Sequence, residues 1–155
     1  MIKEYIIKNK KILTKNIDDC FRKSSSITKY LTNVIINSAF KHKLKIKKEV
    51  KLNNFRGTKR NWRGTIDIRV FEKKNIFDIE IDRGNKLWSL EKLHHCRNML
   101  NHEVLWIKWG LPINEKAMEK IKKYNIDFLF LPTEAHRKHK KKMEKLSLGS
   151  KYRHD

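Results

Sequence analysis

Hydrophobic residues along this chain recur with two different periods, and the two periods divide most of the sequence into helices and strands. From Ser24 to Ala39 an apolar residue returns every three or four positions, which predicts an amphipathic helix. In residues 65–71 apolar and polar positions alternate, which is typical of a strand with one buried face. Residues 104–109 are apolar on both faces, as in the central strand of a sheet. Along the whole chain these rules predict helices at 24–39, 86–100 and 112–124 and strands at 44–52, 65–71, 76–82, 104–109 and 126–131.

The predicted elements follow the order αβββαβαβ, which indicates a single α/β domain with a mixed β-sheet flanked by helices. A chain of 155 residues is long enough for one hydrophobic core and too short for two domains. We expect this core in residues 21–132. Residues 1–20 mix short apolar stretches with lysines, a pattern compatible with either a strand or a helix. Residues 133–155 are basic and poor in apolar side chains, which predicts a flexible tail.

The chain carries a formal net charge of +21 at pH 7, from 38 Lys and Arg against 17 Asp and Glu. This excess favours binding to a polyanion, because Lys and Arg side chains that neutralise phosphates release condensed counter-ions. DNA is the first candidate partner and RNA the second. No basic helix has the broad apolar face that lying on a membrane requires, and no apolar run is long enough to cross one. The N-terminal residues lack the cleavage site of a signal peptide, so we expect an intracellular protein.

Acidic residues are concentrated in one predicted β-hairpin. If its loop consists of residues 72–75, Phe71 pairs with Ile76. The same register then brings Asp67 directly opposite Glu80. One face of the hairpin is therefore expected to pack into the core. The other face is expected either to form a functional site or to face solvent. The remaining pairs on the polar face are Arg69 with Asp78 and Thr65 with Asp82, and the apolar face holds Ile66, Ile68, Val70, Phe77, Ile79 and Ile81.

Two carboxylates that face each other across a strand pair repel one another unless a cation lies between them. Directly opposed Cβ atoms are about 4.5–5.5 Å apart, which is close enough for Asp67 and Glu80 to share one divalent ion. The Arg69–Asp78 pair has opposite charges and so supports the register. Solvated acids on an amphipathic hairpin are the alternative, but that interpretation does not explain why a lysine-rich chain puts four acids on one face.

This pattern resembles the PD-(D/E)xK nuclease superfamily, whose core is a helix, a three-stranded meander, a second helix and a further strand. Residues 24–109 cover that core. The resemblance implies a restriction-endonuclease-like domain in which an Asp near the start of the second strand and an acid in the third strand bind Mg²⁺ or Mn²⁺. The matching residues are Asp67 in Gly-Thr-Ile-Asp-Ile and Glu80 in Asp-Ile-Glu-Ile-Asp. Because such enzymes usually cut two strands, the resemblance also implies a homodimer.

The family's lysine normally lies two residues after the second acid, where this chain has Asp82. Some members place it on the following helix, where Lys92 is the first candidate and Lys86 the second, and Lys108 is a more remote third. The resemblance implies that this lysine stabilises charge or orients the attacking water. Asp82 either ligates a second ion or a metal-bound water, or caps the turn that follows its strand.

Basic residues near the hairpin are the candidates for contact with nucleic acid. The loop before the Asp67 strand combines guanidinium groups with an indole, which suits phosphate contact and base stacking. A solvated turn with its tryptophan folded onto the core is the alternative. The candidate contacts are Arg56, Lys59, Arg60, Trp62 and Arg63 in this loop, Lys45 and Lys47 on the first strand, and Lys138 and Lys140 in the tail.

The sequence thus favours a Mg²⁺-dependent DNA endonuclease of the homing, restriction or junction-resolving kind. A non-catalytic nucleic-acid-binding protein with the same fold is one alternative, because Asp82 occupies the position of the usual lysine. An RNA-binding or ribosome-associated basic protein is another, which the composition alone permits.

Overall fold

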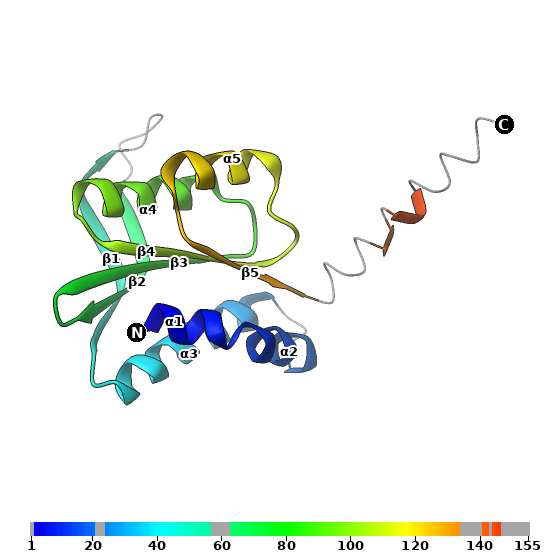
Figure 1. The fold of residues 1–155 in the computed structure, drawn as a ribbon, viewed down its shortest axis with the longest axis horizontal. Helices are drawn as coiled ribbons and strands as arrows, with labels where there is room; N and C mark the ends of the chain where they lie inside the picture. Colours follow the sequence, from blue (N-terminus) through cyan, green and yellow to red (C-terminus); the bar gives the residue numbers. More distant parts are fainter. Residues whose placement is uncertain (1, 21–23, 57–62, 134–140, 143, 147–155) are drawn as a thin grey trace.

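A five-stranded β-sheet lies between two groups of helices in the computed structural model of the chain (Figure 1). The structure describes all residues except 1, 21–23, 57–62, 134–140, 143 and 147–155. Helices α1, α2 and α3 cover one face of the sheet, and α4 and α5 cover the other. The main helices are α1 (Ile2–Lys8), α2 (Lys10–Cys20), α3 (Ser24–Lys41), α4 (Leu87–Met99) and α5 (Glu115–Tyr124). The strands are β1 (Lys45–Arg56), β2 (Arg63–Glu72), β3 (Asn75–Asp82), β4 (Glu103–Gly110) and β5 (Phe128–Pro132).

The sheet is mixed, because β1, β2 and β3 are antiparallel neighbours whereas β3, β4 and β5 run parallel. Helix α4 connects β3 to β4, and α5 connects β4 to β5, as parallel strands require. The order of elements from α3 to β5 is αβββαβαβ, so the predicted α/β fold class is confirmed. In the part of the chain that the structure describes, no helix is long and apolar enough to cross a membrane.

From Ile68–Ile79 to the turn, the β2–β3 hairpin has the register expected from the sequence. Glu72 and Asn75 still pair, so the loop is two residues long and not four. The ladder ends before Asp67 and Glu80, so the expected direct pairing of these two acids is not part of it. The pairs are Ile68–Ile79, Arg69–Asp78, Val70–Phe77, Phe71–Ile76 and Glu72–Asn75.

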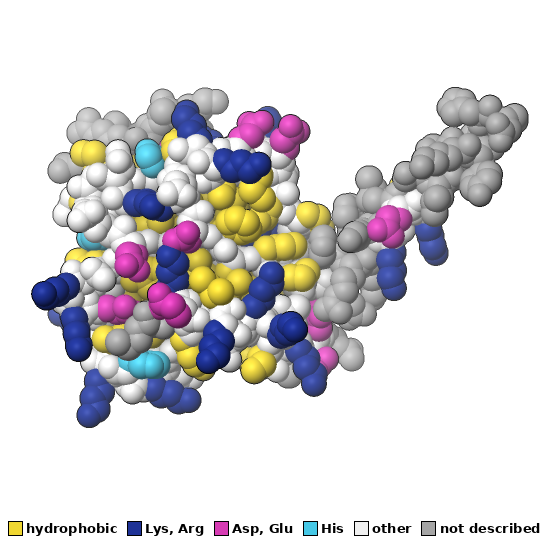
Figure 2. All heavy atoms as spheres, viewed as in Figure 1, with side chains coloured by type: hydrophobic (Ala, Val, Ile, Leu, Met, Phe, Trp, Pro, Cys, Tyr) yellow, Lys and Arg dark blue, Asp and Glu magenta, His cyan; other side chains and the backbone are white. Residues whose placement is uncertain are grey.

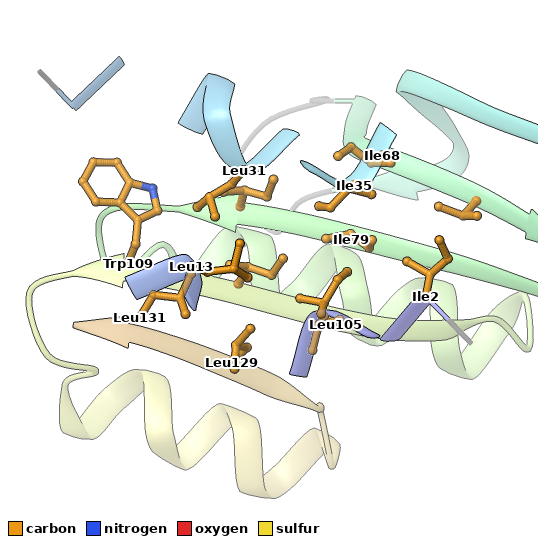
Figure 3. Close-up of a cluster of buried hydrophobic side chains, with 14 of the residues drawn as sticks. Ile2, Leu13, Leu31, Ile35, Ile68, Ile79, Leu105, Trp109, Leu129 and Leu131 are labelled. Atoms are coloured by element: carbon orange, nitrogen blue, oxygen red, sulfur yellow. The ribbon is translucent and has the colours of Figure 1, made fainter. Parts of the chain in front are cut away.

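Two hydrophobic clusters cover the two faces of the sheet. The first packs against α1, α2 and α3 and includes Ile68 and Ile79 (Figure 3). The second packs against α4 and α5 and includes Leu52 and Ile66. Placing Ile66 on the same apolar face as Ile68 is therefore wrong. The pairing of β1 with β2 is also irregular, because its register shifts between Lys51 and Arg56.

Helices α1 and α2 form from the segment whose sequence pattern is ambiguous, and both belong to the first cluster. Ile2, Ile6, Leu13 and Ile17 are all buried, and Figure 3 shows Ile2 and Leu13 over the strands. The backbone N–H of Ile2 donates a hydrogen bond to Glu72 Oε1 at 3.0 Å, which ties the start of α1 to the β2–β3 hairpin. The N-terminal helices thus complete the core on this face of the sheet.

Helix α4 buries Leu90, Leu93 and Cys96, whereas Leu100 is 40% exposed. The predicted helix extends to residue 100, but α4 ends at Met99 and Leu100 is its C-cap. The helix also buries Lys92. A buried lysine requires a partner for its charge, and its partners lie in the pocket described below.

Replacing Ile6 by Ala is expected to lower the free energy of unfolding by about 2–5 kcal/mol, because the buried side chain leaves a cavity. Its neighbour Ile7 is 44% exposed and makes Ile7→Ala a matched control, with an expected change within about 0.5 kcal/mol. Urea denaturation of the two variants and the wild-type chain measures the difference. Equal, small losses in both variants would contradict a core role for α1.

Candidate active site

A pocket of about 480 Å³ opens at the C-terminal end of β3 and is lined by residues from both faces of the sheet. Three acids of the hairpin share it with three basic side chains. In sheets with parallel strands, ligands commonly bind at this end of the strands. The lining residues are Thr28, Asp67, Glu80, Ile81, Asp82, Arg83, Lys86, Trp88, Ser89, Lys92 and Trp109.

Asp67 and Glu80 approach each other where the β2–β3 ladder ends. Asp67 Oδ2 accepts a hydrogen bond from the backbone N–H of Ile81 at 2.9 Å, which holds its carboxylate against β3. Glu80 is 1% exposed, and its carboxyl group interacts with that of Asp67. The structure therefore brings these two predicted ligands together without the direct cross-strand pairing.

Burial, and after it the Asp67 carboxylate, raise the pKa of Glu80 to about 9, although the Lys92 ammonium acts in the opposite direction. Glu80 Oε1 lies against the Lys92 ammonium group, with which it forms an ion pair. Burial and Asp67 thus favour the protonated form of Glu80, and Lys92 favours the ionised form. A cation placed between the two carboxylates would allow both to ionise.

Lys92 reaches the acids from the second turn of α4. Its ammonium group forms the ion pair with Glu80 and donates a hydrogen bond to the carbonyl oxygen of Thr65 at 2.7 Å. The side chain passes close to Gly64, where an added Cβ would lie 3.1 Å from Lys92 Cδ and 2.6 Å from the Phe55 ring. A side chain at position 64 would therefore displace Lys92 or Phe55, so the glycine keeps this path open.

Asp82 is 4% exposed and already has partners within the chain. Its Oδ2 accepts a hydrogen bond from the indole Nε1 of Trp106 at 2.8 Å. Lys86 Nζ lies 3.4 Å from the other oxygen, and the Lys86 side chain is 68% exposed at the mouth of the pocket. Asp82 therefore holds Trp106 in place and gives Lys86 an anchor.

Lys108 lies outside the pocket and joins the loops that follow β3 and β4. Its ammonium group donates hydrogen bonds to three backbone carbonyls, at 2.5 Å to Arg83, 3.0 Å to Trp109 and 2.5 Å to Leu111. Burial lowers the pKa of Lys108 to about 8, while the nearby Asp82 charge raises it. This lysine thus supports the end of the sheet and does not face the acid pair.

The donor set fits a divalent ion held by two carboxylates. Among the described residues, no group of three or more His, Cys, Asp or Glu side chains is arranged to hold a metal ion. Asp67 and Glu80 nevertheless supply two hard oxygen ligands, and a cation between their neighbouring carboxyl groups would offset the unfavourable charge interaction. Mg²⁺ is commonly held by one or two carboxylates, with water and substrate phosphates at its other positions. The two acids therefore fit Mg²⁺ or Mn²⁺.

The predicted nucleic-acid contacts lie in several parts of the molecule. Lys45 and Lys47 are exposed on β1, 5.6 and 6.0 Å from the centre of the Phe71 ring. Phe71 is near the hairpin turn, so these lysines lie at the opposite end of β3 from the pocket. Arg56 and Arg63 are paired through their backbones where β1 meets β2. The candidates Lys59, Arg60, Trp62, Lys138 and Lys140 lie outside the described residues.

The pocket also contains residues that sequence patterns did not select. Trp88 from α4 and Trp109 from β4 line it, and the guanidinium of Arg83 lies 5.9 Å from the Trp109 ring centre. Thr28 comes from α3 on the other face of the sheet. A tryptophan in an apolar strand is indistinguishable by pattern from an ordinary core residue. Of these residues, only Arg83 could have been selected from the sequence, because it directly follows the strand that carries Glu80.

Asp78, the fourth acid of the hairpin, lies outside the pocket and is fully buried. Arg69 donates to its two oxygens, at 2.6 Å through Nε and 3.1 Å through a terminal nitrogen. His102 Nδ1 lies 2.7 Å from Asp78 Oδ2. Asp78 is therefore satisfied by protein partners, including the arginine that the register assigned to it.

Comparisons with known proteins found distant structural similarity. No protein family model and no curated protein matches the chain. A protein of unknown function, AF1548, is 12% identical with a TM-score of 0.41, over 63% of this chain and 54% of that chain. A repair endonuclease from Pyrococcus abyssi is 15% identical with a TM-score of 0.40, over 74% and 49%. EndoMS in a complex with dsDNA is 17% identical with a TM-score of 0.36, over 63% and 43%.

The chain spans about half the length of these solved structures. Similarity at this level assigns no activity to the chain. Its function therefore has to follow from the chemistry of the pocket and from the charge around it.

The raised pKa of Glu80 implies a pH-dependent stability in the absence of divalent ions. The unfolded carboxyl group ionises near its ordinary value of 4.5 and the folded one near 9, so stability falls as the pH rises between these values. Glu80→Gln cannot ionise, so its gain in free energy of unfolding over the wild-type chain is expected to be larger at pH 8 than at pH 5, by about 1 kcal/mol or more. Urea titrations in EDTA measure both values. The same difference at both pH values would contradict the raised pKa.

Proposed function

We propose that the chain is a divalent-metal-dependent endonuclease that hydrolyses DNA phosphodiester bonds. The observation that carries the proposal is the carboxylate pair of Asp67 and Glu80, with the Lys92 ammonium beside it, in one pocket. Phosphodiester hydrolysis requires an activated water and stabilisation of the negative charge that develops on the phosphate. The pocket offers groups for both tasks, and the net charge of +21 favours a polyanionic substrate.

The residues of the pocket have separate roles in this proposal. Asp67 and Glu80 hold Mg²⁺ or Mn²⁺, which when bound polarises the scissile phosphate and lowers the pKa of the attacking water. Lys92, positioned by its hydrogen bond to the backbone of β2, stabilises the negative charge that develops on the phosphate. Arg83 and Lys86 are exposed at the mouth of the pocket, where they contact the neighbouring phosphates.

Two observations favour a second function, binding of nucleic acid without cleavage. Lys92 already forms an ion pair with Glu80, so part of the negative charge is neutralised within the chain. Asp82, at the position of the family's usual lysine, is bonded to Trp106. In that case the pocket is a polar core that stabilises the fold, and the basic surface alone binds the nucleic acid.

A substrate panel separates the two functions. The chain is incubated with supercoiled plasmid, phage DNA, genomic DNA and structured RNA at matched salt, with Mg²⁺ or Mn²⁺. The proposal expects cleavage of at least one DNA, and the ratio of nicked to linear plasmid reports whether one strand or both are cut. Binding of these DNAs without cleavage under any divalent ion would support the non-catalytic function. Preferential cleavage or binding of RNA would indicate that RNA, and not DNA, is the substrate or ligand.

A further inference from the structure

A second groove, of about 790 Å³, lies beside α2 on the face of the sheet that α4 and α5 do not cover. Figure 2 shows Lys and Arg side chains, drawn dark blue, over this part of the molecule. We call it the α2 groove. It is lined by Lys10, Lys11, Thr14, Lys15, Asp18, Asp19 and Pro132.

The lysines of the α2 groove are available to an anionic ligand. Lys10, Lys11 and Lys15 are exposed, and none of them forms an ion pair with a described residue. The two acids of the groove, Asp18 and Asp19, come from the last turn of α2. Positive charge is therefore concentrated in the first half of the helix.

The spacing of these lysines suits a chain of phosphates. Lys11 and Lys15 are four residues apart, so they lie on the same side of the helix, about 6 Å apart along its axis. One strand of duplex DNA presents a phosphate about every 3.4 Å along its axis, so this span covers about two phosphates. Lys10 also lines the groove and adds a third ammonium group.

The α2 groove and the acid pocket lie at the same edge of the sheet. Strands β3, β4 and β5 are parallel, so their C-terminal ends meet at one edge, where Asp82 pairs with Lys108 and Gly110 with Pro132. Pro132 lines the α2 groove, and Asp82 lines the pocket. Neighbouring strands are about 4.8 Å apart, so β5 lies roughly 10 Å from β3. A nucleic-acid strand that enters the pocket therefore passes within a few nucleotides of α2.

We infer that the α2 groove binds the phosphate backbone of nucleic acid beside the bond that the pocket cleaves, an inference that rests on the proposed function. Lys10, Lys11 and Lys15 make sequence-independent contacts that position the strand. This adds backbone contacts from an N-terminal helix to those of Arg83 and Lys86 at the mouth of the pocket. The β1 lysines Lys45 and Lys47, at the hairpin end of the sheet, are farther from the chemistry.

The test is the salt dependence of duplex DNA binding, measured in EDTA so that no cleavage occurs. The test variant replaces Lys10, Lys11 and Lys15 by Gln. The control variant also removes three exposed lysines, but at the opposite edge of the sheet. It replaces Lys73 and Lys74 in the hairpin turn and Lys122 near the end of α5 by Gln.

A lysine that neutralises one phosphate contributes about 1 to the slope of log K against log salt, so the slope of the test variant is expected to be shallower by about 3. The slope of the control variant is expected to change clearly less. Protection from acetylation supplies an independent readout, in which DNA shields Lys10, Lys11 and Lys15 and leaves Lys73 and Lys74 reactive. Both variants should keep the wild-type melting temperature.

The outcomes separate this inference from the proposed function. Equal slopes in the two triple variants, or unprotected lysines in α2, would contradict phosphate binding by the α2 groove even if the chain cleaves DNA. Binding with the expected slope change but without cleavage in Mg²⁺ would support the groove and contradict the endonuclease. A wild-type chain that binds no DNA at any salt concentration would overturn both.

Discussion

Replacing Glu80 by Gln is expected to reduce the rate of DNA cleavage at least about 10³-fold, an increase of roughly 4 kcal/mol in the activation free energy. Gln keeps the size and polarity of the buried side chain but removes the negative charge that the divalent ion requires. Because Glu80 is 1% exposed and its removal relieves the repulsion from Asp67, the fold should be retained or stabilised. A loss of cleavage activity together with a gain in stability would show that Glu80 serves catalysis and not the stability of the fold.

Single-turnover cleavage rates at saturating Mg²⁺ measure this effect. Glu103→Gln is the matched control, because Glu103 is an exposed acid at the start of β4, at the opposite edge of the sheet from the pocket. The control is expected to cleave at the wild-type rate. A Glu80→Gln variant that retains cleavage within about threefold would contradict its role as a ligand.

Replacing Lys92 by Met is expected to reduce the cleavage rate by about 10²–10³-fold, the loss typical of removing one group that stabilises developing negative charge. Met preserves the apolar stem that crosses Gly64 and removes only the ammonium group. DNA affinity should change little, because the buried ammonium contacts Glu80 and Thr65 and adds little to the exposed basic surface.

Binding and single-turnover cleavage, measured on the same DNA, separate the two effects of this substitution. Lys73→Met in the hairpin turn is the control, with both quantities expected at wild-type values. Full cleavage by Lys92→Met would assign the role to Lys86 at the mouth of the pocket, because Lys108 is directed at backbone carbonyls. A parallel loss of binding and cleavage would instead indicate that Lys92 supports the structure of the pocket.

Much of the fold follows from local patterns in the sequence. The order of strands and helices can be predicted because the alternation of apolar and polar residues extends over whole strands and the helical repeat over whole helices. The hairpin register is readable because a short loop leaves few ways to pair the apolar faces, and Arg69 opposite Asp78 agrees with it. From that register alone, Asp67 and Glu80 emerge as neighbours.

The rest depends on contacts between distant parts of the chain. Ile66 belongs to the cluster on the opposite face of the sheet from Ile68, a change of face that no period in β2 reveals. The partner of Asp82 is Trp106, 24 residues away on the next strand, so its hydrogen bond could not be read from the hairpin. Helices α1 and α2 acquire their place only through the sheet that they cover. The α2 groove could not be predicted from the sequence, because it forms where the end of β5 lies beside α2.

The most direct test of the proposed metal site is the Mg²⁺ dependence of phage DNA cleavage by the wild-type chain and by Asp67→Asn. The wild-type chain is expected to be inactive in EDTA and to reach a saturating rate as Mg²⁺ rises, because two carboxylates bind the ion. Asp67→Asn is expected to remain at least about 10²-fold slower at every Mg²⁺ concentration. Cleavage by the wild-type chain that persists in EDTA, or equal Mg²⁺ dependence in the two chains, would contradict a metal site at Asp67 and Glu80.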